Sequence, residues 1–172
     1  AARQSAELAI WPAHVELQLG RRTGARERFA EAAIQASRVT DLAVRQRVEY
    51  YVAAGRALAA GSGGDAIATQ TSAITAARRY QDFRFPGLLR ARAQARRGAG
   101  DFPGPAADLR EGIAWLLGPG GNGAMGGVWS RRLVGGDALF ADLVSLEAAA
   151  GDPDAAFLVT EQDRAWWYGR LQ

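Results

Sequence analysis

Few side chains in this 172-residue chain could carry out acid–base or metal chemistry. His14 is the single histidine, and the chain has no cysteine. Disulfides, thiolate metal sites and thiol nucleophiles are therefore excluded within this segment, and one imidazole cannot build a multi-histidine metal centre. No serine or acid stands at a compelling catalytic spacing from His14. We therefore expect no enzyme activity, no metal site and no cofactor.

The densest charge lies between residues 78 and 97. Seven arginines occur there against one acid, Asp82, with aromatic residues interleaved. Such a mixture can bind phosphates and stack bases, but it is more often a solvated helix face whose charges meet acids of the adjacent helix. Because the whole chain carries a formal charge of only +3, we favour the second interpretation. Nucleic-acid binding is kept as the least favoured alternative.

A glycine-rich segment spans residues 118–136, where seven of the first ten residues are Gly or Pro. It lacks the Lys-Ser/Thr ending of a phosphate-binding loop and follows a predicted helix instead of a strand. The backbone entropy of so many glycines argues against a helix. We predict a long loop, which could lie in a binding groove or become ordered on a partner.

The elements that position these residues are predicted to be paired helices. Glycines at short turns, Gly20, Gly61, Gly100 and Gly151, are spaced by 41, 39 and 51 residues. Apolar residues recur at intervals of three and four on both sides of each turn, which is the helical period, and no strand-like alternation extends over more than a few residues. We expect helical hairpins over residues 3–38, 41–80, 87–117 and 137–170, within a single domain. One hairpin cannot bury its own apolar face, so neighbouring hairpins must stack.

The residues around these glycines resemble the tetratricopeptide repeat. Seven positions before the glycine this repeat has a small residue, which is matched by Ala13, Ala54 and Ala93 but is Val144 in the last hairpin. Eleven positions before the glycine it has a large residue, which is matched by Tyr50, Leu89 and Phe140 but is Ala9 in the first hairpin. The alanine five positions after the glycine is matched by Ala25, Ala66 and Ala156, with Pro105 as a departure, and the alanine twelve after it by Ala32 and Ala73, with Gly112 and Asp163 as departures. The spacing near 40 residues exceeds the 34 of that repeat, which leaves a HEAT-like pair as an alternative. The resemblance implies an all-α, right-handed superhelix that binds other proteins.

The end of the chain is similar to the closing repeat before the caspase-like CHAT peptidase domain of bacterial repeat proteins. The matching residues are Phe140, Leu143, Gly151, Asp152, Pro153, Ala156, Glu161, Arg164 and Ala165. This resemblance implies that the chain is the regulatory part of a larger protein, whose catalytic His and Cys would lie beyond Gln172. A chain that opens without Met is consistent with a fragment or a processed chain.

The resemblance also implies a concave groove along the first helix of each hairpin. Its predicted lining includes Val48 and Gly55, together with the side chains expected to meet a partner, which are His14, Tyr51, Arg90, Gln94, Arg97 and Ser145. Three of these, Arg90, Gln94 and Arg97, could anchor a carboxylate. A groove of this kind suits a peptide bound by shape and apolar contact.

Three consecutive aromatic residues, Trp166, Trp167 and Tyr168, cannot all face one direction on a helix. At least one is expected to point outward and to mark where another domain or a second copy docks. No run of eighteen apolar residues exists, so we expect no membrane span, and the absence of cysteine fits a cytoplasmic location. We expect the chain to be a non-catalytic scaffold for protein–protein interaction or regulation, and a homo-oligomer is possible. The alternative is a peptide or small-ligand sensor domain of a transcriptional regulator of the tetratricopeptide type.

Overall fold

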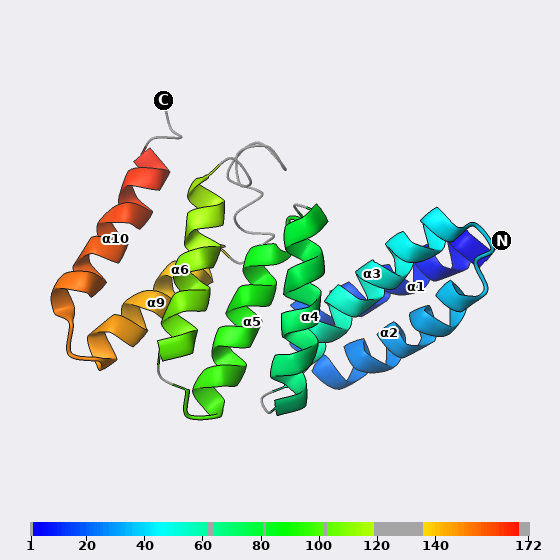
Figure 1. The fold of residues 1–172 in the computed structure, drawn as a ribbon, viewed down its shortest axis with the longest axis horizontal. Coiled ribbons are helices and arrows are strands. Elements are labelled where there is room, and N and C mark those ends of the chain that lie inside the picture. Colours follow the sequence, from blue (N-terminus) through cyan, green and yellow to red (C-terminus); the bar gives the residue numbers. More distant parts are fainter. Residues whose placement is uncertain (1, 62–63, 81, 102, 119–135, 169–172) are drawn as a thin grey trace.

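A computed structural model describes residues 2–61, 64–80, 82–101, 103–118 and 136–168. These residues form eight α-helices and no strand, which confirms the all-helical prediction for this part of the chain (Figure 1). The helices are α1 (Ala2–Gln18), α2 (Arg22–Ser37), α3 (Leu42–Ala59), α4 (Gly64–Tyr80), α5 (Phe85–Gly98), α6 (Pro103–Leu117), α9 (Gly136–Ala149) and α10 (Pro153–Tyr168). Most of the predicted glycine-rich loop, residues 119–135, lies outside the described residues. Among the described helices, none is both long and apolar enough to cross a bilayer.

Three of the four turn glycines take a left-handed backbone conformation. Gly20, Gly100 and Gly151 have φ values of 73°, 78° and 79°, a region that residues with a Cβ rarely adopt. After each of them, the next backbone N–H bonds to a carbonyl five residues back, as in Arg21 to Glu16 at 2.8 Å. This is the Schellman ending of a helix. The sequence period therefore corresponds to a repeated local structure.

Aspartates that follow two of these glycines begin the next helix. The Gly104 N–H donates to Asp101 Oδ1 at 3.0 Å, and the Ala155 N–H donates to Asp152 Oδ1 at 2.9 Å. These bonds satisfy amide hydrogens that a first helical turn leaves unpaired. A Gly-Asp pair thus ends one helix and starts the next.

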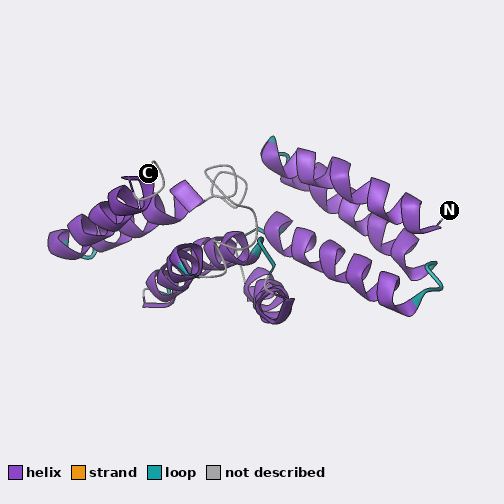
Figure 2. Cartoon of the chain, turned by 90° about the horizontal axis from the view of Figure 1, so that it is seen from above, coloured by secondary structure: helices purple, strands orange, loops and turns teal. Residues whose placement is uncertain are grey.

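The helices lie side by side in chain order, with the first hairpin and the last at opposite ends of the molecule (Figures 1 and 2). Each helix contacts the next, and the first helices of successive hairpins, α1, α3, α5 and α9, also contact one another in turn. The apolar core divides into three clusters, and each of them contains residues from two successive hairpins. Burial is therefore shared between neighbours, as expected for hairpins that cannot fold alone.

The small residues that mark the first three hairpins of the repeat, Ala13, Ala54 and Ala93, are buried. Gly112, one of the departures from the repeat pattern, lies so near the next hairpin that a Cβ there would be 3.1 Å from Leu139 Cδ2. A small residue at these positions permits the helix-to-helix contact. The departure at residue 112 therefore keeps the small size that the position needs.

Candidate functional site

An open groove of about 910 Å³ lies between α3 and α4. Alanines of both helices line it, including Ala53, Ala73 and Ala76, together with the hydroxyl groups of Thr69 and Ser72. Side chains this small leave the space that leucines would otherwise fill between two helices. The groove can therefore accept another chain segment close to the helix backbones.

Charged side chains also belong to the lining of the groove. Arg56 on α3 and Arg79 on α4 belong to its lining, as does Glu49. Arg56 lies in the last turn of α3 and Arg79 in the last turn of α4. Glu49 is 3.9 Å from the guanidinium of Arg45 one helical turn earlier. The balance of the flanking charge is positive.

Sequence reasoning missed this groove. It placed the binding face of α3 on Tyr51 and its neighbours, whereas the groove is lined by Gln46, Ala53 and Arg56. Alanine content alone gives no signal for it, because α1 and α2 are about as rich in alanine as α3 and α4. The alanine content shows that helices can approach closely, but it does not show where they separate.

Two of the residues predicted to anchor a partner's carboxylate hold a carboxylate of the chain itself. Arg90 Nε on α5 donates to Asp142 Oδ2 on α9 at 2.7 Å, and Gln94 Nε2 donates to the same oxygen at 3.3 Å. The chemistry expected at Arg90 and Gln94 is therefore present, but it joins two successive hairpins. Arg97 and Ser145 are exposed, and the Ser145 hydroxyl donates to Ala141 O of its own helix.

The predicted inner face is largely core in the second hairpin. Val48 and Gly55 are buried, so the expectation that these two residues line an open groove is wrong. A Cβ at Gly55 would lie 2.2 Å from the ring of Phe29 on α2. The face was assigned incorrectly because α3 packs on α1 and α2 through these residues.

His14 and Tyr51 lie around a buried ion pair, Asp82–Arg84. The Arg84 guanidinium donates to both carboxylate oxygens of Asp82, at 2.8 and 2.6 Å. It also stacks over three aromatic rings, with Tyr51 nearest at 4.4 Å, Phe83 at 5.2 Å and Tyr50 at 5.3 Å from carbon to centroid. Guanidinium stacking and bidentate pairing are the contacts that arginine forms best. The cluster ties the start of α5 to α3.

Burial and charge shift the pKa values of this cluster. Burial alone would raise the pKa of the Asp82 carboxyl, but the hydrogen bonds and charge of Arg84 outweigh it and lower that pKa. Burial, followed by the positive charge of Arg84, lowers the pKa of His14, whose ring lies edge-on to Phe29 at 5.3 Å between centroids. Burial likewise raises the pKa of Tyr50. These groups therefore stay in fixed protonation states near neutral pH, which suits a structural cluster.

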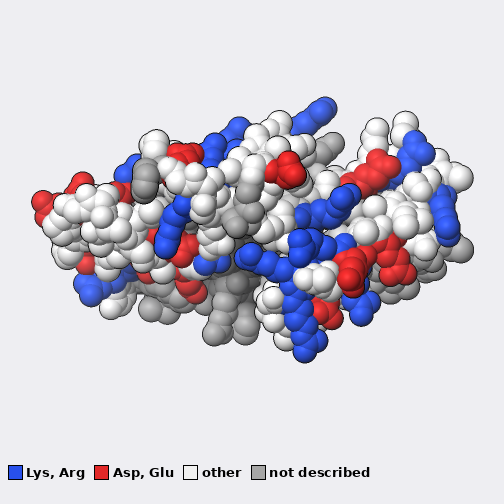
Figure 3. Space-filling model, turned by 90° about the horizontal axis from the view of Figure 1, so that it is seen from below, with Lys and Arg blue, Asp and Glu red and all other residues white. Residues whose placement is uncertain are grey.

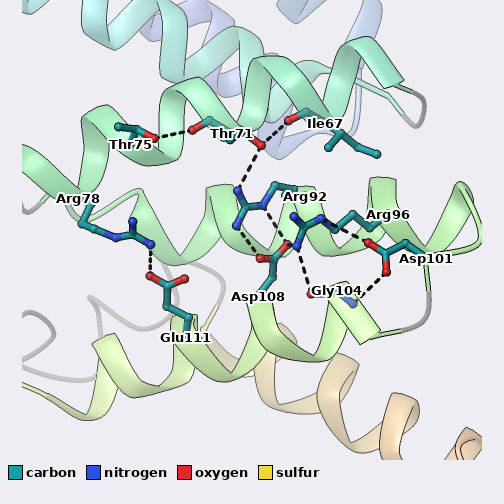
Figure 4. A network of polar contacts seen from close by, with 10 residues as sticks. All are labelled: Ile67, Thr71, Thr75, Arg78, Arg92, Arg96, Asp101, Gly104, Asp108 and Glu111. Atoms are coloured by element: carbon teal, nitrogen blue, oxygen red, sulfur yellow. Dashed lines mark hydrogen bonds and ion pairs between the residues drawn. The ribbon is translucent and has the colours of Figure 1, made fainter.

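The arginine run at 78–97 is largely paired with acids. Figure 4 shows its centre, where Arg92 and Arg96 both reach the buried carboxylate of Asp108 on α6. Arg92 donates to the two oxygens at 3.0 and 2.6 Å and Arg96 to one of them at 3.1 Å, while Arg92 also bonds Thr71 Oγ1 on α4 at 3.2 Å. Arg78 pairs with Glu111. Acids of a neighbouring helix thus meet Arg78, Arg92 and Arg96, as expected, but the Arg92–Asp108 pair is buried instead of solvated.

Positive and negative side chains are interspersed over the face seen in Figure 3. Arg84, Arg90, Arg92 and Arg96 are each paired with an aspartate. A long phosphate backbone is best bound by unpaired cations of one sign. The pairing of these arginines therefore does not favour binding of a phosphate backbone.

The terminal aromatic residues differ in exposure. Tyr168 is exposed and Trp166 is half-buried, whereas the side chain of Trp167 lies outside the described part of the chain. An outward-facing aromatic residue is therefore present at Tyr168, as expected. The predicted docking of a partner at this end stays a prediction.

Among the described residues, no group of three or more His, Asp or Glu side chains is placed to hold a metal ion. The chain matches no family model, and neither curated proteins nor solved structures give a significant match.

Proposed function

We propose that this chain is a non-catalytic protein–protein interaction scaffold that binds a helical segment of another protein in the α3–α4 groove. The groove itself carries the proposal. It is about 910 Å³ in volume, open to solvent, lined by alanines of both helices and flanked by Arg56 and Arg79. A third helix can lie in such a channel when its contacting face carries small residues.

The charge of the groove indicates the partner's composition. The lining carries two arginines, Arg56 and Arg79, and one acid, Glu49, and this positive balance favours a segment with acidic side chains. The proposed ligand is therefore an acidic helix with alanine, glycine or serine on one face.

We further propose, from the sequence resemblance, that the stacked hairpins form a tetratricopeptide-like right-handed superhelix. Contacts between successive first helices support this arrangement. The assignments to a CHAT peptidase protein or to a transcriptional regulator's sensor domain stay predictions. Sequence beyond Gln172 with a paired His and Cys would favour the first of these.

Selection of helical peptides from a displayed library tests the groove. Wild-type protein should enrich acidic peptides, and synthetic versions should bind it in calorimetry. Ala53→Trp, which fills the groove from an exposed position on α3, should weaken binding at least about tenfold, or 1.4 kcal/mol. Ala30→Trp, at an exposed alanine of α2, is the matched control and should bind normally. A library that yields no binder, or binders indifferent to Ala53→Trp, would contradict the proposal.

A further inference from the structure

A chain of contacts joins the two walls of the α3–α4 groove at the end of α4. Asp82 follows α4, and its backbone N–H donates to Ala77 O of that helix at 3.0 Å. Its carboxylate accepts three hydrogen bonds from Arg84, one from the backbone N–H at 2.8 Å and two from the guanidinium at 2.8 and 2.6 Å. The position of Arg84 is therefore fixed relative to the last turns of α4.

The guanidinium of Arg84 reaches the other wall of the groove. Its carbon lies 5.3 Å from the ring centroid of Tyr50 and 4.4 Å from that of Tyr51, both on α3. Tyr50 is one of the side chains that line the groove, whereas Asp82, Arg84 and Tyr51 do not line it. A guanidinium can stack on aromatic rings while its planar fork stays paired with a carboxylate. Tyr50 is thus held by an ion pair that lies outside the groove.

The burial of this pair makes it a directional link. Only 9% of the side chain of Asp82 and 9% of that of Arg84 is exposed. Water therefore competes little for the hydrogen bonds between them, in contrast with ion pairs on the surface. The charge of Asp82 also acts on Tyr50, because after burial it is the largest cause that raises the pKa of this phenol. The ion pair and Tyr50 are therefore coupled by charge as well as by packing.

A second contact joins α3 to α4 nearer to the turn between them. The side chain of Gln70 on α4 is fully buried, and its Nε2 donates to Ala57 O of α3 at 3.4 Å. Ala53 lies between Tyr50 and Ala57 in α3, and Ala73 lies between Gln70 and Ala77 in α4; both alanines line the groove. Alanine side chains are too short to reach across an open groove. The separation of its walls therefore depends on the contacts at either end.

We propose that Asp82 and Arg84 are positioning residues for the groove: the pair holds Tyr50 beside the end of α4 and so sets the separation of α3 and α4 at which a partner helix fits. This inference rests on the proposed peptide-binding function and adds the residues that control its affinity from outside the groove. Walls that are held in place before binding need not be ordered by the partner, which strengthens binding. Removing the pair therefore weakens binding although the lining of the groove is unchanged.

The separation of the walls is measurable without a peptide. The chain has no cysteine, so spin labels can be attached specifically at Gln46→Cys on α3 and Ser72→Cys on α4, two exposed positions on opposite walls. With the ion pair intact, electron paramagnetic resonance should give one narrow distribution of distances between the labels. Asp82→Ala combined with Arg84→Ala removes both charges, so that neither is left unpaired, and should broaden the distribution. Arg84→Lys keeps a positive charge but loses the planar fork and its stacking, and should broaden it less.

Glu147→Gln is the matched control for these variants. It breaks the pair between the buried carboxylate of Glu147 on α9 and Arg110 on α6, two helices that do not line the groove. It should lower thermal stability but leave the distance distribution as in the wild type. A distribution that stays narrow without the Asp82–Arg84 pair, or that Glu147→Gln broadens equally, would overturn the proposal. If circular dichroism shows that the double alanine variant does not fold, Arg84→Lys is the deciding variant, and a distribution identical to that of the wild type would overturn the proposal.

Calorimetry with an acidic helical peptide selected on the wild type is the second test. Asp82→Ala combined with Arg84→Ala should weaken binding at least about fivefold, whereas Glu147→Gln should not change it. Tyr50→Leu should also weaken binding, and adding the two alanine substitutions to it should cost little more, because their effect passes through Tyr50. Fully additive losses would contradict this role of Tyr50. A library that yields no peptide would refute the binding function, whereas the distance measurement would still show whether the ion pair sets the separation of the walls.

Discussion

Arg90 Nε lies 2.7 Å from Asp142 Oδ2, although 52 residues separate them in the chain. The pair joins α5 to α9, two helices between which the glycine-rich residues 118–136 lie in the sequence. About a third of each side chain is exposed. The side chains of Arg90 and Gln94, which the sequence suggests are available to a partner, thus bind Asp142 of the same chain. A peptide that bound to them would have to displace the Asp142 carboxylate.

Replacing Asp142 tests how much this pair stabilises the contact between hairpins. Asp142→Ala should lower the free energy of unfolding by less than about 1 kcal/mol, because partly exposed ion pairs are screened by water and salt. Urea unfolding at low and high salt measures the loss, which should shrink at high salt. A loss that is large and independent of salt would indicate a packing role instead.

Asp108 should be far more sensitive than the acids on the surface. Asp108→Asn removes the charge that two arginines share in a buried position. Breaking a buried pair leaves uncompensated charge and costs about 3–5 kcal/mol. Glu111 lies on the same helix as Asp108, and Glu111→Gln breaks its exposed pair with Arg78 of α4. This substitution should change the free energy of unfolding by at most about 1 kcal/mol. Equal effects of the two substitutions in urea unfolding would refute this ranking.

Gly55 is expected to be intolerant of even one methyl group. A Cβ there would lie 2.2 Å from the Phe29 ring, so Gly55→Ala should destabilise the protein by about 1–3 kcal/mol through overpacking. Gly61→Ala, where a Cβ meets no atom within 4 Å, is the control and should be nearly neutral. The double variant Phe29→Leu with Gly55→Ala should recover part of the loss. Thermal unfolding measures the stability of each variant. A small loss of stability in Gly55→Ala that Phe29→Leu does not reduce would contradict the contact between Gly55 and Phe29.

His14 should make stability depend on pH below neutrality. Its pKa is lowered in the folded protein, so the unfolded chain binds the proton more tightly. The contribution of neutral His14 is fully present above the unfolded pKa of about 6.5 and is lost as the pH falls from there toward the folded value. Unfolding at pH 7.5 and 5.0 should show a smaller pH effect in His14→Gln than in the wild type. Parallel curves for the two proteins would rule out this linkage.

The aspartate beside His14 titrates in a lower range. The pKa of Asp82 is lowered, so the stability it contributes is present above about pH 3.9, its unfolded pKa, and is lost as the pH falls through the folded value. The measurements at pH 5.0 and above therefore isolate the histidine.

The sequence by itself determined the helices and their turns. Periodic apolar residues, the glycines at 20, 100 and 151, and the aspartates at 101 and 152 act within one or two helical turns, so their consequences can be predicted locally. The buried alanines at 13, 54 and 93 also follow from the repeat register. Residues that act only on their chain neighbours need no knowledge of the tertiary structure.

Only the tertiary structure decided which faces are covered. Arg90 and Gln94 have a partner, Gly55 is buried and Trp11 is exposed because of how the hairpins rotate and stack. The groove between α3 and α4 depends on where two helices rich in alanine separate. A helical period fixes which residues share a face, but the rotation of that face relative to the next hairpin is set by contacts between residues far apart in the chain.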